Sequence, residues 1–175
     1  MLKALDGILV VDLAGSVATT YCSKLFVDYG ATVVNLEPEV GFPTRQLAPF
    51  IDEAFTESAM HGYLNANKKS VRRDLISDDA IAALLSEANL VLGDGTDIGL
   101  FDSRLRMDIS WYDDCGPYAD FIGSDAQCFA LNGMLRNIGH ADGPPLIPTG
   151  YQAQIVGGMT AVSYTHLTLP TTPYV

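Results

Sequence analysis

Gly30-Ala31-Thr32-Val33-Val34-Asn35-Leu36-Glu37-Pro38 is the stretch that decides the fold of this chain. Its β-branched apolar residues predict a strand over residues 31–36, directly after a glycine placed to end a helix. Upstream, residues 7–13 form a short apolar run, which is typical of a strand buried on both faces of a parallel sheet. Between the two, apolar residues from Val17 to Tyr29 recur at helical spacing. This order predicts a right-handed parallel crossover, the unit of a Rossmann-like α/β domain.

The rest of the chain continues this alternation of strands and helices. Proline, glycine and mixed polar residues predict an extended loop over residues 38–66, with a short helix near residues 53–63. A loop of this length in a compact domain is usually functional. Gly157 and Gly158 indicate a close approach to a neighbouring element. Further strands are predicted over residues 70–75, 89–92 and 106–111, and further helices over residues 77–88, where Ser77 can cap the first turn, 125–134 and 152–162.

The composition limits the classes of protein to consider. With 48% hydrophobic and 18% charged residues, 175 residues can build one globular domain. The formal charge of -11 argues against nucleic acid or an anionic membrane as a partner, because both are bound through a basic surface. The short apolar run near the N-terminus supports neither a signal peptide nor a membrane span. The three cysteines lack a CxxC or a histidine at ligand spacing, so we expect a reduced, cytoplasmic protein without a metal site.

A basic cluster stands out against this acidic background. Four of the ten positive residues lie within six positions: Lys68, Lys69, Arg72 and Arg73. One interpretation is a site for a small anionic ligand. The other is a solvated strand edge, where lysines commonly prevent aggregation. The local sequence leaves both open.

Other polar groups also have a chemical and a structural interpretation. The glycines of residues 93–99 do not fit the dinucleotide fingerprint, so a nicotinamide nucleotide would have to be held at residues 15–17 instead. The acids Asp113, Asp114 and Asp120 could do acid/base chemistry, but their place around a Gly-Pro turn favours a solvated turn. Asp12 at a strand end can likewise cap the next helix rather than react. His61 and His140 lack an identifiable catalytic partner, and we interpret them as structural.

Five short motifs follow one another in a fixed order, at residues 30–37, 41–45, 65–75, 116–118 and 143–145. They contain Gly-Ala and Glu, Gly and Arg, Asn with Lys-Lys-Ser-Val, Gly-Pro-Tyr, and Gly-Pro-Pro. This ordered set resembles the class III CoA transferases, the family of formyl-CoA and carnitine CoA transferases. The resemblance covers residue 5 to about residue 162. It implies that the chain is an N-terminal, large-domain fragment built on a Rossmann-like parallel sheet.

The resemblance implies transfer of CoA from an acyl-CoA to a free carboxylic acid, with acyl-CoA as a substrate and no tightly bound cofactor. In the family, an aspartate attacks the thioester to give a mixed anhydride. The CoA thiolate then returns to form an enzyme thioester, from which the acceptor acid takes the CoA. The resemblance further implies that five residues contact CoA: Ala18, Arg45, Lys68, Lys69 and Arg72.

Gln154 occupies the position of the nucleophilic aspartate. A neutral amide cannot form the anhydride, although it can orient a substrate by hydrogen bonds. We therefore expect the fragment to be inactive alone. In one alternative, the chain is the non-catalytic, structural half of a fused CoA transferase whose other half keeps the aspartate. A 2-methylacyl-CoA racemase relative is a weaker alternative, because Gly123-Ser124-Asp125 lacks the histidine of that branch.

The resemblance also bears on domain organisation and assembly. Residues 1–162 are expected to form the incomplete N-terminal domain. Residues 163–175 have no helical period and resemble translated adapter sequence, so we expect a non-native tail. Residues 18–20 and 93–95 depart from segments that usually touch CoA, and residues 96–109 are short, which argues against an ordinary adenine pocket. The full-length protein is expected to be an interlocked homodimer or a fused pseudo-dimer.

Overall fold

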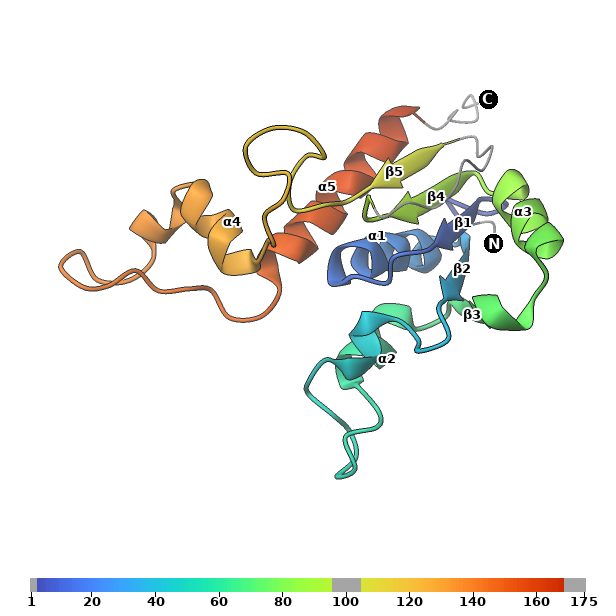
Figure 1. Ribbon diagram of the computed structural model, residues 1–175, viewed down its shortest axis with the longest axis horizontal. Helices are drawn as coiled ribbons and strands as arrows, with labels where there is room; N and C mark the ends of the chain where they lie inside the picture. The colour runs from blue at the N-terminus through green and yellow to red at the C-terminus, as the bar shows by residue number, and fades with distance from the viewer. Residues whose placement is uncertain (1–2, 96–104, 169–175) are drawn as a thin grey trace.

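Five parallel strands form the centre of the molecule, which is described here from a computed structural model over residues 3–95 and 105–168. Their order across the sheet is β3-β2-β1-β4-β5 (Figure 1). The first two strands lie close to the predicted ranges, and the order is that of a doubly wound Rossmann-like sheet, so the predicted α/β fold is confirmed. The strands are β1 Leu9–Asp12, β2 Thr32–Glu37, β3 Lys69–Arg72, β4 Leu90–Gly93 and β5 Arg106–Asp108.

Helices cover both faces of the sheet. On one face, α1 (Val17–Asp28) and α5 (Gln152–Thr168) pack beside each other over a core that contains Val10 of β1. On the other face, α3 (Asp78–Glu87) packs on Val11, the next residue of the same strand. Adjacent residues of a strand point to opposite faces, so burial on both sides explains the unbroken apolar run. In the described part of the chain, no helix combines the length and apolarity that crossing a membrane requires.

Two local signals in the sequence set the ends of α1, and only the one at Gly30 was predicted. The Ser16 hydroxyl accepts a hydrogen bond from the Thr19 amide at 3.2 Å and caps the first turn. At the other end, Gly30 has φ +108°, a conformation that glycine adopts without a Cβ penalty, and β2 follows. Ser77 caps α3 in the same way, through the Ala80 amide.

Several predicted boundaries were wrong. The helix in the long loop is α2, Ala59–Asn65, and a 3-10 turn, Pro43–Gln46, precedes it. The strand predicted to residue 75 ends three residues earlier, because a 3-10 turn, Arg73–Leu75, follows. The strand predicted to residue 111 likewise ends at Asp108. The two strand errors have one physical cause: a strand ends where its neighbour stops pairing with it, which local composition does not record.

The C-terminal helix also differs from expectation. Residues 152–162 were predicted to start a helix, and α5 continues beyond them to Thr168, through residues whose sequence has no helical period. Residues 169–175 lie outside the described part, and the non-native origin of the tail stays a prediction. Gly158 makes the predicted close approach, because a Cβ on it would lie 2.5 Å from Ala18 O in α1. Gly157 has only an ordinary contact.

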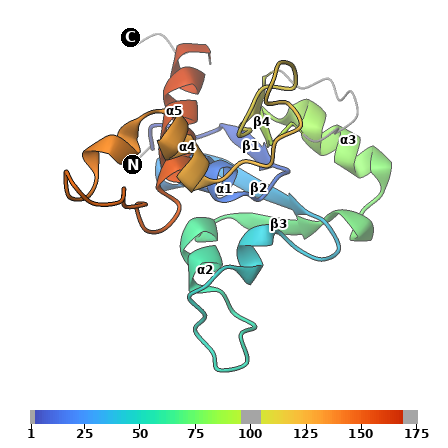
Figure 2. The same cartoon turned by 60° about the vertical axis from the view of Figure 1, so that its left-hand side comes forward.

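The segment between β5 and α5 leads away from the sheet and carries α4 (Asp125–Leu131) (Figures 1 and 2). The helix was predicted over residues 125–134, but α4 ends at Leu131 and a 3-10 turn, Met134–Asn137, follows. Large apolar side chains are exposed on this segment: Phe121 by 56%, Ile122 by 89% and Ile147 by 58%. We call residues 109–150 the arm.

Candidate functional site

A pocket of about 320 Å³ opens beyond the carboxyl ends of β1, β4 and β5. It lies where the order of the strands reverses, because β2 lies on one side of β1 and β4 on the other. In open α/β sheets this switch point is the usual place for a ligand. Ten residues line the pocket: Ser16, Ala18, Asp94, Ile109, Ser110, Trp111, Cys128, Ala153, Gln154 and Gly157.

The start of α1 forms one wall of this pocket. Asp12, at the end of β1, accepts hydrogen bonds from the amides of Ala14 at 3.3 Å and Gly15 at 3.2 Å. Asp12 therefore holds the turn that leads into the helix, which agrees with the structural interpretation of this residue. The first amides of a helix have no acceptor within the helix, so Ser16 and Ala18 lie where a helix favours negative charge on a ligand.

The start of α5 forms the facing wall. Asp125, the first residue of α4, accepts hydrogen bonds from the amides of Ala153 at 2.7 Å and Gln154 at 3.3 Å. Its other carboxylate oxygen lies 3.2 Å from Nε2 of the Gln154 side chain. One carboxylate from the arm thus holds both the backbone and the side chain at position 154. We call this pair of residues the Asp125–Gln154 clamp.

The predicted CoA-binding residues do not gather in one place. Ala18 and Gln154 line the same pocket, although they are far apart in the sequence. Arg45, Lys68, Lys69 and Arg72 do not line it. These four residues belong to β3 and the loops around α2, on the opposite side of β1 from β4 and β5. The structure therefore separates a pocket from a basic region.

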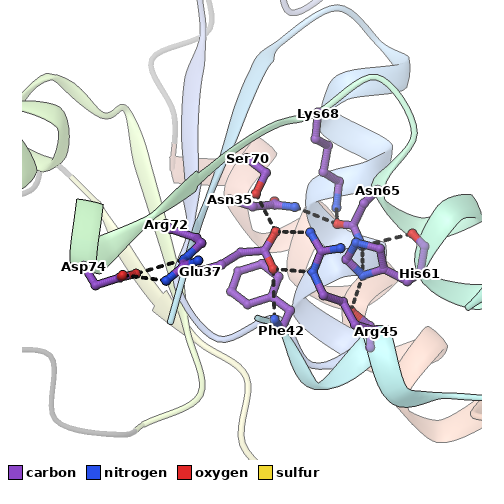
Figure 3. A network of polar contacts seen from close by, with 11 residues as sticks. Asn35, Glu37, Phe42, Arg45, His61, Asn65, Lys68, Ser70, Arg72 and Asp74 are labelled. Atoms are coloured by element: carbon purple, nitrogen blue, oxygen red, sulfur yellow. Dashed lines mark hydrogen bonds and ion pairs between the residues drawn. The ribbon is translucent and has the colours of Figure 1, made fainter. Parts of the chain in front are cut away.

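Lys68 lies inside this basic region and binds internal partners (Figure 3). Its Nζ donates to three acceptors: Thr20 O at 2.8 Å, Ser23 Oγ at 2.8 Å and Asn65 Oδ1 at 3.0 Å. These use all three donors of an ammonium group. Ser23 in turn donates to Asp12 at 2.9 Å, so a hydrogen bond links the positive charge to the end of β1.

Burial is the largest influence on the pKa values of Lys68 and Asp12. Burial lowers the pKa of Lys68 to about 8, and the attraction of Asp12 opposes this shift only in part. Burial also raises the pKa of Asp12, against the effects of Lys68 and of the Gly15 amide. Lys68 thus joins β3 to α1 and α2, and a phosphate on it would compete with three protein acceptors.

Glu37 and Arg45 form a second internal contact, at the end of β2 (Figure 3). Arg45 donates through Nε and Nη2 at 2.7 Å each, and the Phe42 amide donates at 2.9 Å. Ser70 of β3 donates to the same carboxylate. Burial alone would raise the pKa of Glu37, but these hydrogen bonds outweigh it and lower the pKa to about 2. The carboxylate therefore fastens the loop after β2.

The two remaining basic residues lie on the edge strand. Lys69 is exposed on β3, as the strand-edge interpretation predicts. Arg72 is also exposed, and Asp74 neutralises it through an ion pair of 2.6 Å. The side chain of Arg45 is 46% exposed at its ion pair, so part of its guanidinium faces solvent.

The other candidates have structural surroundings. The Thr44 hydroxyl and the Asn65 amide contact His61 Nδ1, at 2.9 Å and 3.1 Å. Asp113, Asp114 and Asp120 are exposed, which agrees with a solvated turn. Most of residues 93–99, and the short stretch up to residue 104, lie outside the described residues. Within those that are described, no group of histidine, cysteine and acidic residues could hold a metal ion.

Asp125 is the residue that the sequence interpretation missed at this site. In the sequence this residue stands only as the last residue of a mismatch to the racemase motif, since nothing local shows that residue 125 lies against residue 154. Its position after Ser124, which caps α4 through the Gln127 amide, did mark it as the start of a helix. Cys128 likewise has no metal-ligand pattern in the sequence, yet it lines the pocket.

Known proteins share both the sequence motifs and this architecture. CoA-transferase family III matches residues 5–96, more than half of the chain. Succinate–glutarate CoA-transferase of Agrobacterium fabrum is 31% identical over 91% of this chain and 45% of its own length. Formyl-CoA:oxalate CoA-transferase of Streptomyces avermitilis is 30% identical over 87% of this chain and 40% of its own length. The chain spans less than half the length of these relatives.

A solved structure agrees with these matches. A CAIB/BAIF family protein from Brucella suis superposes with a TM-score of 0.80 at 26% identity, covering 97% of this chain and 50% of that protein. The resemblance inferred from the ordered motifs is thereby confirmed. The chain belongs to CoA-transferase family III, the CaiB/BaiF family.

Proposed function

We propose that this chain binds CoA or an acyl-CoA thioester in the pocket between α1 and α5, as part of a protein that transfers CoA from an acyl-CoA to a carboxylic acid. The observation that carries the proposal is the meeting of Ala18 and Gln154 in one pocket at the switch point of the sheet. The relatives named above carry CoA-transferase names, which supports the same ligand class.

Position 154 limits the chemistry that this chain can contribute. The Gln154 amide is neutral and cannot attack a thioester to form an anhydride. We therefore propose that the chain holds and orients CoA without supplying the nucleophile at this position. Such a role corresponds to the non-catalytic half of a fused transferase, in which another copy of the pattern supplies an aspartate. A racemase role has no observation in its favour.

The basic region is proposed to receive the phosphates of CoA. Lys69 and Arg72 are exposed and are the candidates for direct contact. Arg45 can contribute the solvent-facing part of its guanidinium. Lys68 is proposed to hold neighbouring elements of the protein together rather than to contact a phosphate, because its three donors already bind internal acceptors.

Partner and compartment are part of the same proposal. The exposed apolar side chains of the arm, such as Ile122 and Ile147, support contact with a second chain or a second half. An interlocked homodimer or a fused pseudo-dimer would cover them. All three cysteines are free, which is typical of proteins in a reducing compartment such as the cytoplasm.

Isothermal titration of the folded, full-length protein with CoA tests the proposal. We expect saturable binding that Ala153→Phe abolishes, because the larger side chain at the start of α5 would fill the pocket. Ala82→Phe, the same substitution on the exposed face of α3, is the matched control and should bind CoA like the wild type. Absence of binding to the wild-type protein at millimolar CoA would overturn the proposal.

A further inference from the structure

The Asp125–Gln154 clamp determines which atom of the glutamine amide a ligand can meet. A carboxylate accepts hydrogen bonds and has none to donate, so the side of Gln154 that faces Asp125 must be the NH2 group. The carboxamide is planar, and its oxygen is on the other side of the group. Gln154 also lines the pocket. The amide oxygen is therefore the polar atom of Gln154 left for a ligand.

We infer that Asp125 is a positioning residue that turns Gln154 into a hydrogen-bond acceptor, and that the pocket selects a ligand segment carrying an N–H or O–H donor. The inference rests on the proposed function, because it identifies the part of CoA that position 154 meets. Both parts of CoA carry donors, because the pantetheine arm has amide N–H groups and adenosine 3′,5′-bisphosphate has an amino group and a 2′-hydroxyl. Gln154 occupies the position of the residue that meets the thioester, at the end of the pantetheine arm, so we assign the donor to a pantetheine amide.

The hydrogen bonds of Asp125 show that this orientation is built into the fold. Its Oδ1 accepts from two successive backbone amides, of Ala153 and Gln154, which fixes the carboxylate at the first turn of α5. Because Oδ1 accepts both backbone hydrogen bonds, Oδ2 is the oxygen that accepts from the Gln154 side chain. The helix cap and the orientation of the amide are separate contacts of one residue, so a substitution can remove one and keep the other.

Asp125→Asn separates the two contacts. The asparagine oxygen can still accept from both amides, which keeps the cap of α5. Its NH2 group would face Gln154 in place of Oδ2, and two NH2 groups cannot hydrogen-bond to each other. The Gln154 amide would turn over and present its NH2 group to the ligand, opposite another donor. Asp125→Ala instead removes both contacts.

Isothermal titration with two probes, CoA and adenosine 3′,5′-bisphosphate, tests the inference in the full-length protein. Asp125→Asn should weaken CoA binding about tenfold, the effect of one lost hydrogen bond, and should leave adenosine 3′,5′-bisphosphate binding unchanged. Gln154→Met, which removes the acceptor at similar volume, should give the same split. In the double variant the loss should not exceed that of either single variant by more than twofold, because both act on one contact.

The control is Asp78→Asn, the same change at the first residue of α3, which should alter the affinity for neither probe. If Asp125 only caps α5, Asp125→Asn will bind CoA like the wild type, and Asp125→Ala will lower the melting temperature. That pattern overturns the inference and leaves the proposed function intact. Equal weakening of both probes by Asp125→Asn also overturns it. A wild-type protein that binds neither probe overturns the inference together with the proposed function.

Discussion

Replacing Glu37 by glutamine tests how far one buried carboxylate stabilises the loop after β2. Arg45, Ser70 and the Phe42 amide all donate to this group, and its side chain is only 2% exposed. Glutamine keeps the shape but turns one acceptor oxygen into a donor, which would face a donor of Arg45 or of the Phe42 amide. We expect Glu37→Gln to fold and to be less stable.

The magnitude follows from the pKa. The folded-state pKa of about 2 lies below the ordinary value of 4.5, and the difference corresponds to about 3 kcal/mol, since one pKa unit equals ~1.4 kcal/mol. Screening at the half-exposed guanidinium of Arg45 reduces this, and we expect a loss of about 2 kcal/mol at pH 7. Because the folded-state pKa is lowered, this stabilisation is present above pH 4.5 and is lost as the pH falls towards 2.

Urea unfolding followed by far-UV circular dichroism, at pH 7 and stepwise down to pH 3, measures the contribution of the Glu37 carboxylate to the free energy of unfolding. The stability difference between wild type and Glu37→Gln should be constant above pH 5 and should shrink as the pH falls below 4.5. The control is Asp74→Asn, which removes the carboxylate of an exposed ion pair and should change the stability little at any pH. A difference that is the same at pH 7 and pH 3, or absent at pH 7, would refute the reasoning.

Two further predictions concern the packing of α1. Gly158→Ala should lower the free energy of unfolding by about 1–3 kcal/mol, because its Cβ would lie 2.5 Å from Ala18 O. Gly157→Ala, where the Cβ makes only an ordinary contact, should be neutral or slightly stabilising. Thermal unfolding of both variants measures the difference. Burial raises the pKa of the Cys22 thiol to about 12, so a thiol reagent at pH 8 should label the exposed Cys115 quickly and Cys22 only on unfolding. Rapid labelling of Cys22 in the folded protein would contradict its burial.

Local sequence patterns were sufficient to predict that the strands of the sheet and the helices covering it exist, although not all of their ends. The apolar run before Asp12 and the run after Gly30 predicted two adjacent parallel strands, and these pair in the structure. Ser77 predicted a helix start, because a hydroxyl needs only amides a few residues away to form a cap. The order of the short motifs also predicted the family. Each of these signals is contained within neighbouring residues or in their spacing along the chain.

The sequence by itself thus determined the α/β class, most of the elements and the membership of the family. Tertiary packing alone decided which residues form the site. It brings Ala18 of α1 to the pocket that Gln154 lines, and it brings Asp125 to the backbone at the start of α5. It also places the charge of Lys68 among internal acceptors, although its neighbour Lys69 is exposed. The physical reason is that burial and hydrogen-bond partners depend on distances across the folded chain, which vary independently of distances along the sequence.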